Sequence, residues 1–198
     1  KTIKALAQTT KTGLVFLLNR ETGEPIFPVE EREVPQGAIE GDYVSKTQPF
    51  PTKPAPLNPT YFDPDKAFGF TFWDRGHCKR TAKKLRNEGL FTPPSLEGSI
   101  HYPSGVGGNN WGGPAIDPER NIMVVNTNNM ASLIVMVPRE DCGKPLKELS
   151  INKTQERFTN IESNEGAPYC NLRSMGFFSP LGVPCTEPPW GTLTAVDL

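Results

Sequence analysis

The sequence lacks long hydrophobic runs, a strong net charge and cysteine pairs at metal-binding spacing. In its 198 residues, no apolar stretch reaches the roughly 18 to 20 residues that a membrane-spanning helix needs. The formal net charge is −1, so the chain has neither a basic field that would attract nucleic acid nor an acidic tail. The four cysteines include no CxxC motif, which argues against a zinc site.

The common self-contained catalytic motifs are missing as well. The chain has no nucleophile elbow, P-loop or dinucleotide-binding fingerprint. Its only histidines, His77 and His101, are isolated, and we expect structural roles for both. The paired carboxylates at 63–65 are separated by a proline and suit a turn better than a metal site. The sequon at 152–154 is a pattern that often matches by chance.

The cysteine count leaves the redox state open. Four cysteines fit two disulfides in an oxidising compartment, and they allow three different pairings. Buried free thiols in a cytosolic protein are an equally good interpretation of the count alone.

Proline and glycine are abundant, with 21 and 18 residues, and only 36% of the chain is hydrophobic. This composition favours short strands and long ordered loops over long helices. Apolar clusters recur along the whole chain, so the sequence does not have a disordered composition.

One motif occurs twice. Residues 12–23 run from a glycine through an apolar strand and a polar residue into a Thr-Gly turn, and residues 190–198 begin the same pattern but end before the turn. A glycine, an alternating strand and a tight turn are typical of a β-propeller blade. The sequence therefore predicts an all-β fold, and we expect the chain to be a piece of a larger repeat protein.

The predicted organisation follows these strand and turn signals. Residues 1–29 are the end of one blade, with strands at 3–7, 14–19 and 25–29. Residues 30–110 are an insertion whose proline-rich part, 30–59, is expected to stay outside any sheet; a flexible linker is the alternative. It contains one helix, at about 74–88, capped by Asp74 and ended by Gly89.

The rest of the chain is predicted to hold the next blade. This blade covers 111–198, and strands at 98–102, 111–118, 122–126 and 133–137 are expected to form its inner part. A long insertion at 139–189 interrupts it, and the chain re-enters the blade at residue 191.

Four stretches resemble one branch of a known family, the membrane-type glucose dehydrogenases among the pyrroloquinoline quinone (PQQ) dehydrogenases. They are TKTG with NRETG (10–23), RNEGLFTPPS (86–95), WGGPAIDP (111–118), and FSPLGVPC with PPWG (178–191). The second and fourth are specific, and the resemblance spans nearly the whole chain in the same order. One departure is Asn19, where the family usually has aspartate.

The resemblance implies a partial eight-bladed propeller of about one and a half blades, with PQQ over the central channel beside Ca²⁺ or Mg²⁺. It implies oxidation of a sugar or alcohol, with electrons passed to ubiquinone or a cytochrome. An aspartate general base is expected before Lys1 and the metal ligands outside this chain, so no catalytic or metal residue is assigned here. The implied location is the periplasm, with an inner-membrane attachment outside this chain left open.

The resemblance assigns Lys11 to the cofactor, because a cation beside the quinone carbonyls would stabilise negative charge there. An exposed turn lysine is the alternative. Asn110 and Trp111 follow a glycine-rich turn, and the resemblance places them in the cofactor pocket as an amide donor and a flat wall; an ordinary turn Asn and a core Trp are the alternative. Gly107 and Gly108 would let the backbone approach the cofactor; a simple turn is the alternative. Trp190 would wall the substrate entrance, although packing between blades is the alternative.

Two further expectations accompany the resemblance. A disulfide between Cys78 and Cys185 would tie the helix to the long insertion, and Cys142 and Cys170 would form a second bridge. We expect the isolated segment to be inactive, with exposed sheet edges that the remaining blades of the parent chain would cover. The competing hypotheses are a non-catalytic propeller scaffold and a quinoprotein alcohol dehydrogenase with a fused cytochrome.

Overall fold

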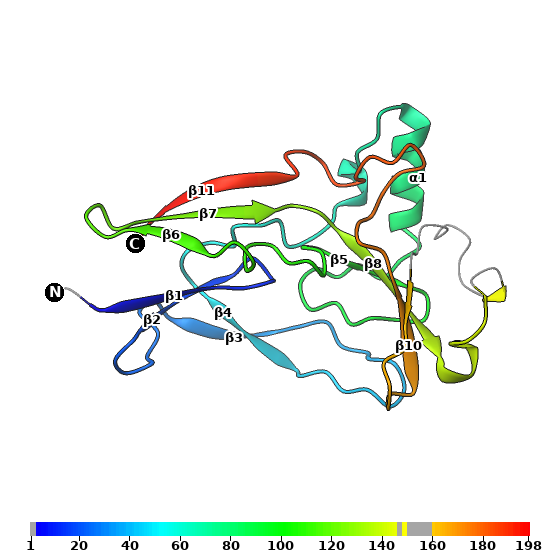
Figure 1. Ribbon diagram of the computed structural model, residues 1–198, viewed down its shortest axis with the longest axis horizontal. Helices are drawn as coiled ribbons and strands as arrows, with labels where there is room; N and C mark the ends of the chain where they lie inside the picture. The colour runs from blue at the N-terminus through cyan, green and yellow to red at the C-terminus, as the bar shows by residue number, and fades with distance from the viewer. Residues whose placement is uncertain (1–2, 146–147, 150–159) are drawn as a thin grey trace.

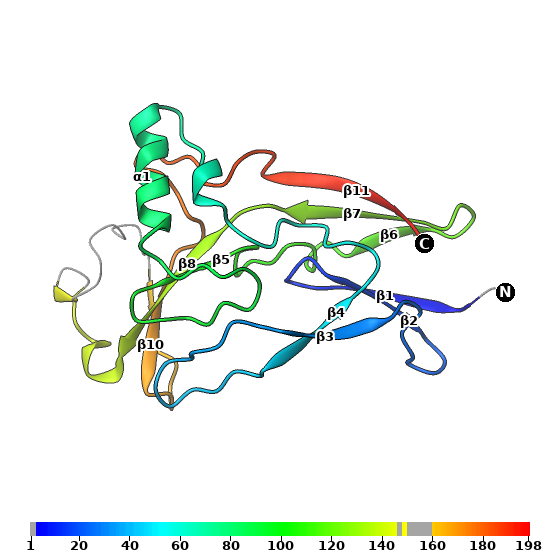
Figure 2. The same ribbon diagram turned by 180° about the vertical axis from the view of Figure 1, so that it is seen from behind.

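A computed structural model describes residues 3–145, 148–149 and 160–198 (Figures 1 and 2). The predicted sequon at 152–154 lies outside these residues. Within these residues, four antiparallel sheets contain most of the regular secondary structure, and one α-helix lies beside them. The first two sheets pair β1 (Ala5–Thr9) with β2 (Val15–Asn19), and β3 (Val29–Glu33) with β4 (Thr47–Pro51).

The other two sheets are larger. One has the order β5 (Ser99–His101), β8 (Ser132–Pro138), β10 (Tyr169–Arg173) and β9 (Asn160–Glu162). The other has the order β11 (Gly191–Asp197), β7 (Ile122–Asn128) and β6 (Pro114–Asp117). The helices are η1 (Pro64–Lys66), α1 (Phe72–Ala82) and η2 (Arg139–Asp141). The expected all-β fold, a partial propeller with one short helix, is confirmed.

The β1–β2 hairpin is formed by the first predicted motif. Its register pairs Thr9 with Val15, and the turn between them is held by the Gly13 amide donating to the Thr10 carbonyl at 3.2 Å. Gly13 has φ of +80°, a conformation that glycine adopts without a steric penalty. Beyond β2, the predicted strand at 25–29 makes only a bridge between Leu18 and Pro25 before β3 begins.

The expectation that 30–59 stays outside any sheet is wrong, because β4 lies in this stretch and contains two prolines. Pro49 faces Glu31, and Pro51 faces Val29. The Thr52 amide donates to the Pro28 carbonyl, so residues 28 and 52 form a hydrogen-bonded pair. In an antiparallel sheet hydrogen-bonded and non-hydrogen-bonded pairs alternate, so the pairs at 29 and 51 and at 31 and 49 are non-hydrogen-bonded. Both prolines therefore occupy non-hydrogen-bonded positions of a two-stranded sheet, where the missing N–H costs nothing.

The predicted next blade is divided between two sheets. β7 pairs with β6 and β11, whereas the following strand, β8, pairs with β5 and β10 (Figure 1). Between β7 and β8, each of three residues bonds to a different segment: the Asn129 amide to the Trp190 carbonyl, the Met130 carbonyl to the Ser104 amide, and the Ala131 carbonyl to the Phe177 amide. These three hydrogen bonds hold residues 129–131 in the position where the chain passes from the β7 sheet to the β8 sheet. The predicted strand from residue 191 is confirmed as β11.

The helix is shorter than the predicted 74–88 and begins earlier. Its N-cap is Thr71, whose side chain accepts a hydrogen bond from the Asp74 amide. The Asp74 carboxylate is fully buried and accepts instead from the amides of Phe70 and Leu181. The helix ends at Ala82, before Gly89, because Arg86 pairs with β5: its amide donates to the Gly98 carbonyl and its carbonyl accepts from the Ile100 amide.

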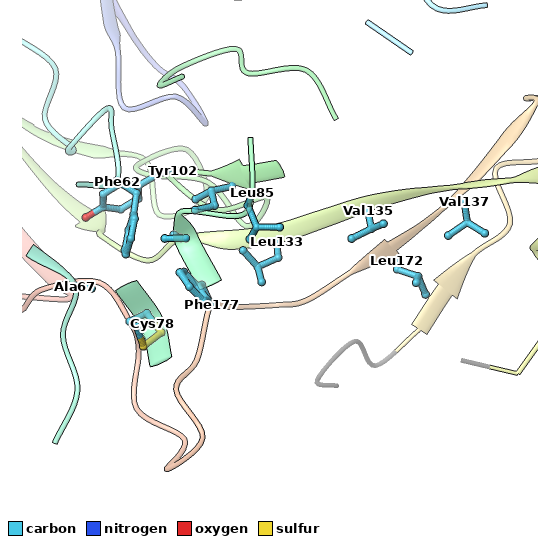
Figure 3. Close-up of a cluster of buried hydrophobic side chains, with 14 of the residues drawn as sticks. Phe62, Ala67, Cys78, Leu85, Tyr102, Leu133, Val135, Val137, Leu172 and Phe177 are labelled. Atoms are coloured by element: carbon cyan, nitrogen blue, oxygen red, sulfur yellow. A yellow bond between two sulfur atoms is a disulfide. The ribbon is translucent and has the colours of Figure 1, made fainter. Parts of the chain in front are cut away.

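The main hydrophobic core lies where α1 faces β5, β8 and β10. Figure 3 shows the side chains of Phe62, Leu133, Val135 and Leu172 among those that fill it. A separate, smaller cluster of Val15, Met123 and Val125 joins the first hairpin to β7.

Both hypothesised disulfides are confirmed. Cys78 of α1 is bonded to Cys185, and Cys142 is bonded to Cys170 of β10. The first bond attaches the helix to the segment that leads into β11, and the second closes a loop beside β8. Within the described part of the chain, no helix is long and apolar enough to cross a membrane.

Candidate functional site

Lys11 stands at the tip of the turn between β1 and β2. Its Nζ donates a hydrogen bond to the Gly105 carbonyl at 2.9 Å and lies 5.5 Å from the centroid of the Trp111 ring. In the described residues, no carboxylate lies within ion-pair distance of this ammonium. Lys11 is an exposed residue of the turn, and its ammonium, which no described carboxylate neutralises, lies against the glycine-rich loop.

The glycine-rich loop, residues 104–110, brings Asn110 to Lys11. Gly107 has φ of +100°, and a Cβ on it would lie 1.9 Å from Asn110 Oδ1 and 3.1 Å from Lys11 Cγ. The two predicted cofactor residues thus meet at Gly107. The loop is held there by the Gly108 amide, which donates to the Lys11 carbonyl at 2.8 Å.

Asn110 and its neighbour Asn109 each have one buried amide atom without a hydrogen-bond partner. In Asn109 this atom is Nδ2, whereas its Oδ1 accepts a hydrogen bond from the Thr10 amide at 3.1 Å, which ties the loop to the Lys11 turn. Asn110 Oδ1 is buried and has no hydrogen-bond partner. An orphaned buried amide oxygen costs free energy unless a ligand, water or another segment supplies a donor.

Trp111 projects from the protein rather than into its core. Its side chain is 76% exposed, and its Nε1 donates to the Val106 carbonyl at 2.5 Å. It precedes β6, which begins at Pro114, so the predicted strand at 111–118 starts three residues late. Within this segment Trp111 therefore lies outside the hydrophobic core. A flat exposed indole beside an ammonium is a surface on which a planar ligand can stack.

Trp190 lies in a different environment. Its Nε1 donates to the Thr186 carbonyl at 2.8 Å, and its ring packs edge-on against Phe68 with 5.7 Å between centroids. Its backbone carbonyl accepts from Asn129 at the start of the chain's passage between sheets. The structure thus groups Lys11, Asn110 and Trp111, and it places Trp190 at the base of β11. Its proposed role at the substrate entrance stays a prediction.

Two cavities lie beside Lys11. The first, of about 270 Å³, is lined by Lys11, Trp111, Ser132, Arg173 and Met175 among others. The second, of about 230 Å³, extends past Phe91, His101 and Tyr102. Arg173 is paired with Glu162 at 2.6 Å, so its charge is largely compensated, whereas that of Lys11 is not.

Two ionisable groups near these cavities are perturbed by burial. Burial lowers the pKa of His101, which keeps the imidazole neutral at neutral pH. Burial, together with the carboxylate of Glu187, raises the pKa of Tyr102 to about 12. His101 Nε2 is buried without a hydrogen-bond partner.

The family profile of the glucose/ethanol/alcohol dehydrogenase β-propeller domain (PQQ) matches residues 1–198. The chain belongs to this PQQ dehydrogenase family. It is 38% identical over 202 residues to the quinoprotein glucose dehydrogenase of Gluconobacter oxydans, covering 99% of this chain and 25% of that protein. It is 36% identical over 194 residues to the quinoprotein glucose dehydrogenase of Escherichia coli, covering 95% of this chain and 23% of that protein.

Relatives named for other substrates are also similar to this chain. The quinate/shikimate dehydrogenase (quinone) of Acinetobacter baylyi is 31% identical over 189 residues, covering 96% of this chain and 23% of that protein. The chain spans about a quarter of the length of the curated relatives it matches. No solved structure matches it significantly.

The residues of this PQQ dehydrogenase segment fit the cofactor's chemistry. PQQ is a planar, anionic quinone, and the site offers the Lys11 ammonium, which no described carboxylate pairs, the exposed indole of Trp111 and the side-chain NH₂ of Asn110 as a donor. Among the described residues, no three His, Cys, Asp or Glu side chains gather as a metal site. The fit is therefore to the quinone rather than to the metal.

Sequence reasoning missed three residues of this candidate site. Arg173 and His101 line the cavities beside Lys11, and Asn58 lies beneath the glycine-rich loop. His101 was expected to be structural only. No local pattern marks any of them, because each reaches the site from a segment distant from Lys11 in sequence.

Proposed function

We propose that this chain forms one wall of the cofactor pocket of a PQQ-dependent dehydrogenase that oxidises glucose or a related sugar or alcohol. The observation that carries the proposal is that Lys11, whose charge no described carboxylate pairs, and Asn110, whose side-chain NH₂ can donate, both lie against Gly107. The names of the glucose dehydrogenases to which the chain is similar support the substrate class.

Each residue has a distinct part in the proposed pocket. The Lys11 ammonium has spare N–H donors beyond the one used on Gly105, so it can bind a quinone oxygen and favour negative charge there. Asn110 supplies the amide, and Trp111 the flat wall. Trp190 is proposed to border the substrate entrance from the base of β11. When bound, PQQ supplies the capacity to take two electrons from an alcohol.

The remaining parts of the reaction are proposed to lie outside this chain. These are the aspartate that takes the hydroxyl proton, the ligands of Ca²⁺ or Mg²⁺, and the route by which electrons reach ubiquinone or a cytochrome. The remaining blades would cover the exposed sheet edges, and the segment alone would be inactive. Two disulfides are typical of an oxidising compartment, which supports a periplasmic location.

A second substrate class is favoured by one finding. Relatives named for quinate and for glycerol are 31% identical to this chain. A hydroxy acid or a polyol therefore belongs in the assay beside glucose. The cofactor proposal is the same for either class.

The test uses the full-length protein that carries this segment. The protein is reconstituted with PQQ and Ca²⁺ or Mg²⁺, and dye reduction is measured with glucose, quinate and glycerol. We expect Lys11→Ala to lower turnover by about 100-fold or more, as loss of a charge-stabilising donor does. The matched control is Lys4→Ala, which removes an exposed lysine of the same hairpin that pairs with Glu21. Absence of PQQ binding and of activity with all three substrates would overturn the proposal.

A further inference from the structure

Asn58 lies at the junction of the segments that form the proposed cofactor pocket. It lies at the end of the proline-rich stretch, and it is only 4% exposed. Its Nδ2 donates to the Asn128 carbonyl at 3.0 Å and to Asn129 Oδ1 at 2.9 Å. Because one acceptor is a backbone carbonyl, these bonds fix which end of the amide carries the nitrogen.

The other end of the Asn58 side chain is wedged between two glycines. A Cβ on Gly13 would lie 2.6 Å from Asn58 Oδ1, and a Cβ on Gly108 would lie 2.4 Å from the same atom. Both distances are too short for any side chain, so the backbones of both glycines approach the amide closely. Gly13 belongs to the Lys11 turn and Gly108 to the glycine-rich loop.

Backbone hydrogen bonds extend this junction on both sides. The Leu57 amide donates to the Gly13 carbonyl at 3.0 Å, and the Gly108 amide donates to the Lys11 carbonyl at 2.8 Å. The Asn128 amide in turn donates to the Gly108 carbonyl at 2.7 Å. The Lys11 turn, the glycine-rich loop and the end of β7 therefore all contact the same buried amide or its neighbours.

Asn129 carries the connection further. Its Nδ2 donates to the Pro189 carbonyl at 3.1 Å, and its backbone amide donates to the Trp190 carbonyl at 2.8 Å. The pair Asn58–Asn129 thus links the Lys11 turn to the segment that leads into β11.

We propose that Asn58 is a positioning residue: it sets the separation between the Lys11 turn and the glycine-rich loop, and thereby places Lys11 and Asn110 for the cofactor. This inference rests on the proposed function. Asn58 acts through Lys11 and Asn110, and the structure gives it no contact with the cavities beside Lys11. The asparagine side chain donates to two acceptors and fits between the two glycine backbones. Alanine would fit there, but it has no donor for either acceptor.

The first experiment is a double-mutant cycle on PQQ affinity in the full-length protein, measured by equilibrium binding without turnover. We expect Asn58→Ala to weaken PQQ binding by about 10- to 100-fold, the range found for residues that orient a metal's ligands. In a Lys11→Ala background we expect the same change to weaken binding by a smaller factor than in the wild type, because Lys11, one of the two residues through which Asn58 acts, is already gone.

The control is Asn87→Ala, since Asn87 also donates its side-chain amide to a buried backbone carbonyl, that of Phe62. We expect it to lower the melting temperature about as much as Asn58→Ala and to leave PQQ affinity unchanged. If the effects of Asn58→Ala and Lys11→Ala on affinity are additive, or if Asn87→Ala weakens PQQ binding equally, Asn58 is only structural and the inference is overturned.

The second experiment does not depend on losing the asparagine. Gly108→Ala places a methyl against Asn58 Oδ1, and Gly108 has no positive φ that would add backbone strain. We expect Gly108→Ala to weaken PQQ binding in the wild-type background and to have no further effect in Asn58→Ala, where the methyl has room. Gly143→Ala is the matched control, because nothing lies within 4 Å of its Cβ position. An equal effect of Gly108→Ala in both backgrounds contradicts the inference.

The two proposals fail in different ways. If the wild-type protein does not bind PQQ, the proposed function is wrong. If the wild type binds PQQ and Lys11→Ala weakens that binding, but the cycle with Asn58 is additive, only the positioning role is wrong.

Discussion

Lys11 and Asn110 lie on one side of Gly107, with Lys11 Cγ 3.1 Å and Asn110 Oδ1 1.9 Å from the position that a Cβ would take there. The β1–β2 turn supplies one residue and the loop before β6 supplies the other. Their shared position against Gly107 brings together two segments separated by the whole proline-rich insertion and α1. It also makes a single glycine the most sensitive point of the proposed pocket.

Gly107→Ala is expected to abolish PQQ binding at concentrations that saturate the wild type. The added methyl would overlap Asn110 Oδ1 and force the loop away from Lys11. Gly23→Ala is the matched control, because Gly23 also has a positive φ, +79°, but has nothing within 4 Å of its Cβ position. Equilibrium binding of both variants separates the clash from backbone strain; equal losses of affinity would contradict the account.

Trp111 is expected to report cofactor binding through its fluorescence. The chain has three tryptophans, and Trp111 is 76% exposed beside Lys11, whereas Trp190 packs against Phe68. We expect PQQ to quench the intrinsic fluorescence of the full-length protein, and Trp111→Phe to remove a larger part of that quenching than Trp73→Phe does. Titrations of the three proteins at equal concentration make the comparison. Identical quenching in both variants would place the quinone away from Trp111.

His101 is expected to make the folded protein less stable as the pH falls below about 6.5, the ordinary pKa of histidine. Burial lowers the pKa of His101 in the folded state. Below about pH 6.5 the unfolded chain therefore binds a proton that the folded chain does not, and the free energy of unfolding decreases until the lower folded pKa is reached.

The measurement is the melting temperature between about pH 7 and about pH 5, for the wild type and for His101→Gln. We expect the wild type to lose more stability than the variant across this range. Parallel losses in the two proteins would show that another group is responsible.

The two disulfides are expected to stabilise the fold unequally. Cys78 and Cys185 are 107 residues apart, and Cys142 and Cys170 are 28 residues apart. Chain entropy assigns losses of about 5 and about 3.5 kcal/mol to their removal, so the longer loop contributes more. Urea unfolding of the Cys78→Ser/Cys185→Ser and Cys142→Ser/Cys170→Ser pairs tests the order. Four free thiols in the intact mass of the non-reduced protein would rule out both bonds.

Local sequence patterns predicted where strands form better than they predicted which strands pair with each other. The strand over Val15–Asn19 follows from a short apolar run, and the hairpin turn follows from the glycine at position 13. Both signals are properties of neighbouring residues. The placement of β7 and β8 in different sheets depends on Ser104, Phe177 and Trp190, which bond to the residues between the two strands. Nothing within 122–138 indicates that the chain changes sheets.

The helix and the proline-rich stretch show the same limit. Apolar spacing predicted a helix through residue 88, but Arg86 pairs with β5, and this tertiary contact overrides helical propensity. The prolines of β4 were expected to exclude a sheet. They are tolerated because each falls at a non-hydrogen-bonded position opposite β3, a register that composition does not reveal.

Only the site residues that lie in or next to the family motifs could be predicted from the sequence. Lys11, Asn110 and Trp111 were singled out from the motifs, and the structure brings them together. Trp190 was grouped with them by its place in the repeat, yet its ring lies against Phe68. Asn58 could not be found from the sequence, because its importance comes from the absence of side chains at Gly13 and Gly108.

The structure of the full-length protein with bound PQQ tests the central claim most directly. The account predicts that Lys11 Nζ and the Asn110 side chain both lie within hydrogen-bond distance of PQQ oxygens, with Trp111 against the ring plane. PQQ bound elsewhere, or Lys11 covered by another blade and out of reach of the quinone, would contradict it.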